Sequence, residues 1–415
     1  MPTVETFALF GPRIAYIVSA NATTIEERSH WLNPVILKWA REWRGRSLDE
    51  VAVKTKKDVR LIEDWERGER TPTVKQARML ADFYDRPFLE FLLPQPPQLP
   101  EPVSLPDYRM HRDTQPPSQN WDLQDIQQWA ETQRINALDL YSEIGEPPPE
   151  LPKALFATPG ETSADVAERS REILSFPIER QMEMTQAEAR DLPGILRDVF
   201  ERVGVLTLKR TELAELKVRG ICIAEFPLPV IVVTRESPSA QAFTLVHEFA
   251  HVLLKQSGVS GSIDRNVRST DVEGWCNRYT GAFLMPERYV QELMGARPAR
   301  PADRIEDIRL ASFAKAFRVS AHAMLIRLVH LGYVAPDYYW NIKKPEFDRQ
   351  EADYSGGGRS TYYGSRYRGT QGDLYTGLVL EAWSNGRITN HNAAEFMGIK
   401  KLEHLEAIRD RFGAS

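Results

Sequence analysis

The sequence predicts a mostly helical α+β protein that is divided into several domains. With 415 residues, the chain is too long for one ordinary hydrophobic core. Several short amphipathic helical patterns occupy the N-terminal part, and β-branched apolar runs appear only at residues 203–210 and 220–234. Helical patterns return after these runs. We therefore expect an all-α N-terminal domain, a central α+β domain and a small helical C-terminal module.

Composition limits the classes of function. A hydrophobic content of 42% and a charged content of 27% are typical of a soluble globular protein. The net charge of −5 does not indicate a nucleic-acid binder, although a small basic domain can be concealed in that average. Two cysteines, Cys222 and Cys276, exclude a disulfide scaffold and suit a reducing compartment. No signal peptide and no membrane span is expected, so we predict a cytoplasmic protein.

Residues 31–93 contain the signals of four or five short helices. Pro34 suits the first position of the helix PVILKWAREW. Ser47 begins the second helix, and Glu50 three residues later completes a capping box. Asp58 is expected to cap the third helix, VRLIEDWERG, because its carboxylate can accept a hydrogen bond from the first turn.

The fourth helix of this set is expected to begin with Thr71 as its cap and Pro72 in its first turn. A short apolar helix, PFLEFLLP, follows it. Short helices with a tight turn between the second and third are typical of a helix-turn-helix domain. The run from Trp39 to Leu93, with LDEVA, LIEDWERGERTPT and RPFLEFLLP, resembles the XRE-type helix-turn-helix family. The resemblance implies DNA binding, and the rival interpretation is a domain that holds a partner protein or positions the rest of the chain.

The third helix of a helix-turn-helix domain places its first residues on base edges in the major groove. Later arginines are expected to meet phosphates. The candidate DNA contacts are Lys56, Lys57, Val59, Arg60, Arg67 and Arg70. Residues 31–93 contain 13 Lys and Arg against 11 Asp and Glu, which is a weak electrostatic signal for DNA.

The sequence HEFAH, from His247 to His251, fits the metal-binding pattern H-E-x-x-H. It lies in a helix that is expected to begin at Ser237 and to end at Gly258. Positions i and i+4 lie on one face of a helix, about 6 Å apart, so two imidazoles can meet one metal ion. Glu248 lies beside the first histidine and is the natural general base. A catalytic zinc normally takes three protein ligands, so a third ligand is expected downstream.

Glu273 is the favoured third ligand. It lies 22 residues after His251, on a second predicted helix, TDVEGWCNRYTGAFLMP, that can pack against the first. Asp271 is a weaker alternative. Cys276 is able to bind zinc by its chemistry, but we expect it to be a small core residue.

The segments FTLVHEFAHVLL and VEGWCNRYTGAFLMP are similar to the signature segments of ImmA/IrrE-type metallopeptidases, over roughly residues 200–295. The resemblance implies a zincin-like fold with zinc (Zn²⁺) bound by His247, His251 and Glu273, a gluzincin-like ligand set, with Glu248 as the base. In that family the peptidases cut repressor proteins. The implied function is therefore a zinc-dependent endopeptidase coupled to a DNA-binding domain, a transcriptional or stress regulator that cleaves a repressor-type protein. The alternative is a non-cleaving DNA-binding regulator, or an antitoxin-like protein whose zincin fold binds a partner.

Two residues are weighed as helpers for the oxyanion of the reaction. Tyr279 can face the cleft, but packing in the core is favoured. His322, on one of two helices expected between residues 305 and 332, is more often an ordinary helix histidine. The strand PVIVV is expected to present an edge that holds an extended substrate through main-chain hydrogen bonds.

The predicted organisation has six parts. They are an N-terminal extension (1–30), the XRE-like domain (31–93), a Pro-rich linker (94–117), a helical region (118–200), the ImmA/IrrE-like peptidase (201–345) and a C-terminal part (346–415) with a Gly/Tyr/Arg-rich loop and a helical module. The expected partners are DNA, a protein substrate that is a repressor or a toxin–antitoxin partner, and a second copy in a homodimer. No membrane partner is expected.

Overall fold

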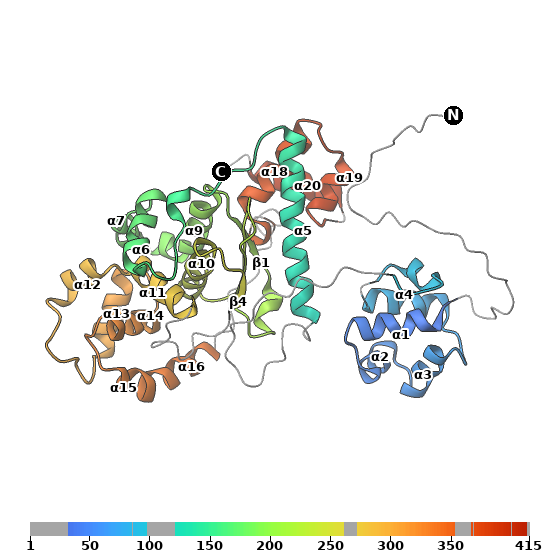
Figure 1. Cartoon of the computed structure of the whole chain (residues 1–415), viewed down its shortest axis with the longest axis horizontal. Helices are drawn as coiled ribbons and strands as arrows, with labels where there is room; N and C mark the ends of the chain where they lie inside the picture. Colours follow the sequence, from blue (N-terminus) through green and yellow to red (C-terminus); the bar gives the residue numbers. More distant parts are fainter. Residues whose placement is uncertain are drawn as a thin grey trace. The chain divides into compact units, whose positions relative to one another are not determined.

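The computed structural model describes residues 32–84, 86–97, 121–260, 272–352, 367, 369–399 and 401–412. It is mostly helical and has one small sheet, which confirms the α+β class (Figure 1). The predicted segments 1–30, 94–117 and 354–370 lie wholly or mostly outside the described residues. No described helix is long and apolar enough to cross a membrane. The chain divides into two compact units, residues 1–100 and 101–415.

The first unit is a set of short helices. They are α1 (Pro34–Trp43), α2 (Leu48–Thr55), α3 (Val59–Arg67), α4 (Val74–Phe83) and the 3-10 helix η1 (Phe88–Leu92). Pro34 stands at the start of α1, Ser47 and Glu50 form the capping box of α2, and Asp58 caps α3, as predicted. An ion pair in which Arg41 Nε lies 2.7 Å from Glu66 Oε1 joins α1 to α3.

The predicted start of α4 is wrong by two residues. Thr73, not Thr71, is the cap, and α4 begins at Val74. The side chain of Thr73 accepts a hydrogen bond from the Gln76 N–H, and the Gln76 side chain accepts one from the Thr73 N–H. Three residues after Thr71 stands Val74, which has no side-chain acceptor, so only the later position satisfies two helix-end donors.

The second unit is built around a four-stranded sheet. Its strands are β1 (Leu206–Lys209), β2 (Gly220–Ile223), β3 (Val230–Val233) and β4 (Gly258–Ser260), in the order β1-β3-β2-β4. β1 pairs with β3 in parallel, and the other pairs are antiparallel. The strand PVIVV is therefore interior and paired on both sides, so the prediction that it presents a free edge is wrong. β1 and β4 are the outer strands of the described sheet.

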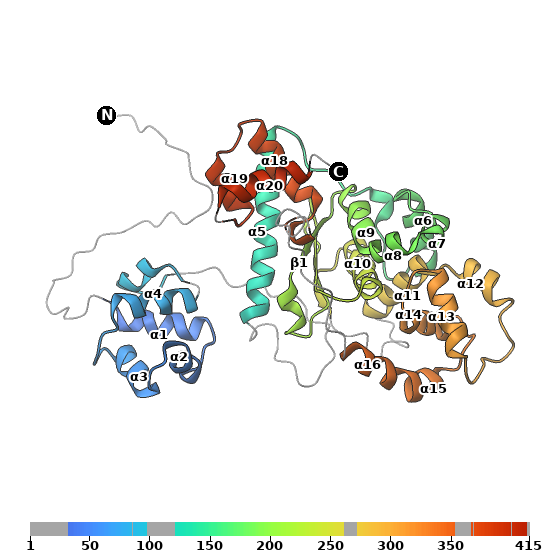
Figure 2. The same cartoon turned by 180° about the vertical axis from the view of Figure 1, so that it is seen from behind.

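The two faces of the sheet contribute to different hydrophobic cores, because successive side chains of a strand point to opposite faces. Cys222 and Ile231 join a core with α10 and its neighbours, whereas Ile221 and Val230 join a second core. The helices of the second core are α5 (Trp121–Ile144), α18 (Asp373–Ser384), α19 (Asn390–Phe396) and α20 (Leu402–Phe412). Figures 1 and 2 show α5 and α18 on one side of the strands and α10 on the other.

Among the remaining helices, η4 contributes Leu213 to the second core, and the others belong to the first core or connect its parts. They are η3 (Lys153–Leu155), α6 (Ser163–Ile173), α7 (Ile178–Glu183), α8 (Gln186–Arg190), α9 (Leu192–Glu201), η4 (Thr211–Ala214), α10 (Pro238–Leu253), α11 (Val272–Leu284), α12 (Glu287–Met294), α13 (Asp307–Ala316), α14 (Ala321–His330), α15 (Pro336–Tyr338), the π-helix η6 (Tyr339–Lys343) and α16 (Lys344–Ala352). α13 and α14 confirm the two helices expected between residues 305 and 332. The regions predicted as 118–200, 201–345 and 346–415 all lie within this single unit.

Helix α10 ends earlier than predicted. It begins after Ser237 with Pro238 in its first position, as expected, but it ends at Leu253. Lys255 adopts a left-handed φ of 54°, which a helix cannot continue through. Gly258 instead opens β4, and the short turn returns the chain from the end of α10 to the sheet.

Candidate metal centre

Two helices bring three metal-ligating side chains to one point. His247 and His251 are one turn apart on α10, and their Nε2 atoms lie 3.3 Å from each other. Glu273 projects from the first turn of α11, which packs against α10. Its Oε2 lies 3.2 Å from His247 Nε2, and its Oε1 lies 2.9 Å from His251 Nε2. Both imidazoles are buried.

The spacing of these donors suits a zinc ion. Zinc–nitrogen and zinc–oxygen bonds of this kind imply about 3.3 Å between neighbouring donors of a coordination tetrahedron. The three measured separations, 3.3, 3.2 and 2.9 Å, lie close to that value. Two imidazoles and a carboxylate are also a donor set that zinc enzymes use, and it leaves a fourth position for water or substrate. The residues present therefore fit the group that the sequence implies.

The sequence left two alternatives for the third ligand, Asp271 and Cys276. Asp271 lies outside the described residues. Cys276 is free and completely buried. Burial, with help from the carboxylates of Glu273 and Glu248, raises the pKa of its thiol well above the usual value. A thiol of that kind stays protonated and is a poor metal ligand, so packing explains Cys276 better.

Glu248 is fully buried beside His247 and lies against strand β2. Burial raises the pKa of its carboxyl to about 8, while the neighbouring His247 opposes that rise. The Ser260 side chain, on the outer strand β4, also favours the ionised carboxylate. A carboxyl group that titrates near neutral pH can both accept and donate a proton, which is the property of a general base that later acts as an acid.

A glycine that the sequence analysis missed makes room for Glu248. A Cβ atom at Gly220, the first residue of β2, would lie 2.3 Å from Glu248 Oε1 and 2.6 Å from its Cδ. The backbone of β2 therefore approaches the carboxylate so closely that only glycine leaves space for it. No local signal marks this residue, since a glycine before a β-branched run simply resembles the start of a strand.

The charges in the cluster stabilise one another. Burial raises the pKa of Glu273, but His247 and His251 lower it far below its usual value. Burial lowers the pKa of His247, yet the carboxylate of Glu273 brings it above its usual value, with smaller contributions from Glu248 and the Asn277 side chain. Asn277 is one turn after Glu273 on α11, and this spacing is the signal that could have marked it as a positioning residue.

The two oxyanion candidates have other contacts. Tyr279 is buried in the core, where its ring stacks on Trp275 at a centroid distance of 5.5 Å. The Nε2 atom of His322 lies 2.9 Å from the Tyr339 hydroxyl, and its ring stacks on Phe347. None of these contacts is with the metal-binding cluster, and they favour the packing interpretation for Tyr279.

In the first unit, the predicted DNA contacts divide into two groups. Lys56, Lys57 and Arg60 are exposed around the start of α3, and Val59 is half-buried. Arg67 and Arg70 form ion pairs with acidic neighbours. Arg67 lies 2.6 Å from Asp64 and 2.8 Å from Glu69, and Arg70 lies 3.6 Å from Asp64. The charge of these two arginines is thus largely compensated within α3 and the turn after it.

Comparison with known families supports both resemblances that the sequence suggested. Residues 37–91 match the family described as "Helix-turn-helix", and residues 201–329 match the family described as "IrrE N-terminal-like domain". No curated protein and no solved structure matches the chain. The matched segments coincide with the two resemblances found in the sequence, and the second contains His247, His251 and Glu273. The chain therefore combines a region similar to DNA-binding helix-turn-helix domains with a region similar to IrrE/ImmA-type metallopeptidase domains.

Proposed function

We propose that this protein is a zinc-dependent endopeptidase that regulates transcription by cleaving a repressor-type protein. The observation that supports the proposal best is the convergence of His247, His251 and Glu273 at coordination spacing, with the buried carboxyl of Glu248 beside them. We also propose a cytoplasmic location, since both cysteines are free thiols.

The proposed chemistry assigns a role to each residue. His247, His251 and Glu273 would hold the zinc ion, which supplies Lewis-acid polarisation of the peptide carbonyl and lowers the pKa of water. Glu248 takes a proton from the attacking water molecule as the new carbon–oxygen bond forms. It then gives that proton to the leaving nitrogen as the carbon–nitrogen bond breaks. The products are a carboxylic acid and an amine, so the atoms balance with water as the only co-reactant.

Zinc content separates the ligands from the base. The purified wild-type chain should hold about one zinc ion, and His247→Ala should lose it while remaining folded. Glu248→Gln should keep the zinc, since the side chain is not among the proposed ligands, but it should lose peptide cleavage because an amide accepts no proton. Undiminished zinc in His247→Ala would contradict the metal site.

The same Glu248→Gln variant separates the enzyme from the binding alternative. A domain that only binds a partner has no use for a buried general base, and the burial of Glu248 therefore favours the enzyme. If the variant regulates its target genes as the wild type does, regulation proceeds by binding. Loss of regulation together with loss of cleavage supports the endopeptidase.

A further inference from the structure

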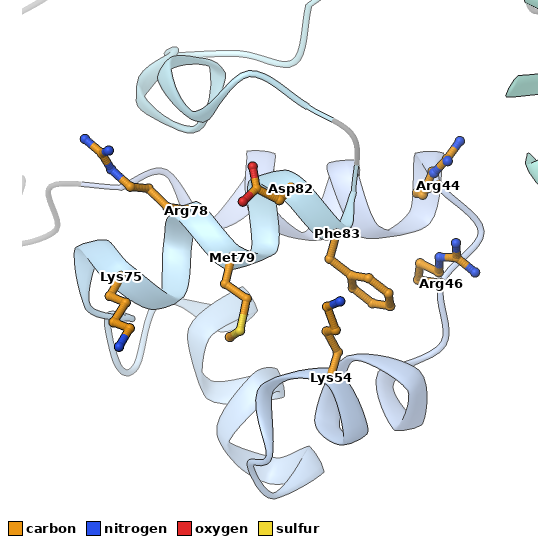
Figure 3. A pocket seen from close by; sticks show the side chains of 8 residues that line it. All are labelled: Arg44, Arg46, Lys54, Lys75, Arg78, Met79, Asp82 and Phe83. Atoms are coloured by element: carbon orange, nitrogen blue, oxygen red, sulfur yellow. The ribbon is translucent and has the colours of Figure 1, made fainter. Parts of the chain in front are cut away.

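A basic hollow of about 630 Å³ lies between α2 and α4 of the helix-turn-helix domain (Figure 3). Its lining residues are Arg44, Arg46, Lys54, Lys75, Arg78, Met79, Asp82 and Phe83. Five of these side chains are cationic and one is acidic. None belongs to α3, so the hollow is separate from the residues that the sequence predicted to contact DNA.

The cations are distributed along the hollow. Met79 and Phe83 project from α4 towards α2, and Lys54 projects from α2 towards Phe83 (Figure 3). Arg44 and Arg46 lie beyond Phe83 at one end, and Lys75 lies near the other end of α4. The eight helical steps from Lys75 to Phe83 correspond to about 12 Å along a helix. One strand of duplex DNA places a phosphate every 3.4 Å or so along its axis, so a length of about 12 Å passes about three phosphates.

The positive charge of the hollow is only partly compensated by the protein. Among the described residues, Lys54, Lys75 and Arg78 form no ion pair with a carboxylate. Arg46 pairs with Glu50 at 3.4 Å. Arg46 and Lys54 also lie 5.1 and 5.3 Å from the centre of the Phe83 ring. A cation–π contact orients a cation but leaves its charge in place. In α3, by contrast, carboxylates already surround Arg67.

We propose that the basic hollow between α2 and α4 binds the phosphate backbone of duplex DNA and supplies the domain's main electrostatic contact with it. This inference rests on the DNA binding that the helix-turn-helix match supports. An acidic peptide is the less favoured ligand, because it would need apolar surface for its other side chains. Much of the apolar surface here belongs to Phe83, and Arg46 and Lys54 already lie over that ring.

The salt dependence of DNA binding tests the proposal. The full-length chain is titrated onto a fluorescent duplex of random sequence at several salt concentrations, and log K is plotted against log salt. Each phosphate contact contributes about −0.9 to the slope. Lys54→Gln and Lys75→Gln should each reduce the magnitude of the slope by about 0.9 and weaken binding about eightfold at 0.1 M salt. Both side chains are exposed, so the two variants should keep the fold. Circular dichroism checks that they do.

Arg67→Gln is the matched control. Because Arg67 is paired with Asp64 and Glu69, its loss should leave the slope unchanged. If the two lysine variants keep the wild-type slope while Arg67→Gln reduces it, the inference is overturned and DNA binding itself stands. If the wild type shows no salt-dependent binding to DNA, both fail. Binding of poly-L-glutamate that requires Lys54, without any such requirement for DNA, would identify the hollow as a protein-binding site instead.

Discussion

Substitution of Gly220 by alanine should disable the general base without removing a single atom from it. The new Cβ would lie 2.3 Å from Glu248 Oε1 and 2.6 Å from Glu248 Cγ. Non-bonded carbon atoms normally lie about 3.5–4.0 Å apart, so the carboxylate or the strand must move by about 1 Å. Gly220 has no left-handed φ, so the backbone itself accepts alanine and the effect is steric.

Two magnitudes follow from this displacement. A misplacement of about 1 Å can lower the rate of the chemical step about 10²-fold. Overpacking of a closely packed core typically costs about 1–3 kcal/mol in the free energy of unfolding. The metal ligands lie on α10 and α11 and not on β2, so the zinc content should stay at the wild-type level.

The assay combines three measurements on the purified full chain. They are kcat/KM on a quenched fluorescent peptide that the wild type cleaves, zinc content, and the free energy of unfolding from urea denaturation. Gly281→Ala is the matched control, because its Cβ would lie 3.4 Å from Arg327 Cδ, an ordinary contact. Wild-type kcat/KM in a Gly220→Ala variant that is folded and holds zinc would refute the role of this close approach.

Further substitutions should separate structural from catalytic roles. Glu273→Ala should lose zinc and activity together, as measured by metal analysis, whereas zinc retention would exclude it as a ligand. Tyr279→Phe should keep the wild-type kcat, because Tyr279 packs in the core. A decrease in kcat of about 10²–10³-fold would instead identify it as an oxyanion donor. Burial lowers the pKa of His330 to about 4, so its contribution to stability is complete above the unfolded-state pKa of about 6.5 and is lost as the pH falls towards 4. His330→Gln should therefore remove about 3 kcal/mol from the acid-induced decrease in the free energy of unfolding, and an unchanged pH profile would contradict the burial effect. Glu201 accepts hydrogen bonds from the Asp373 and Leu374 N–H groups at the start of α18, so Glu201→Ala should cost about 1–3 kcal/mol in urea denaturation.

Local features of the chain were predicted well from the sequence. The capping box of Ser47 and Glu50, the cap at Asp58 and the start of α10 at Pro238 depend on residues within one helical turn. The proximity of His247 and His251 has the same origin, because an α-helix brings positions i and i+4 together wherever it lies in the fold. Glu273 was favoured because it lies on a second predicted helix downstream of the motif, and the family resemblance implied the same residue. The structure places its carboxylate beside both histidines.

Other features depend on segments that are distant in the sequence. The interior position of β3 follows from pairing with β1 and β2, and strand composition does not specify such neighbours. The second core joins α5 to α18, although more than 200 residues separate them. The basic hollow likewise forms only when α2 and α4 pack together.

By itself, the sequence determined the two domain types, the helix with the metal-binding motif and the ligand types that suit zinc. Those properties reside in local periodicity and in the chemistry of individual side chains. Only the tertiary structure decided that Gly220 gives Glu248 its space and that cations from α2 and α4 share one hollow. These features bring together residues of different elements, and they depend on how those elements pack against each other in three dimensions.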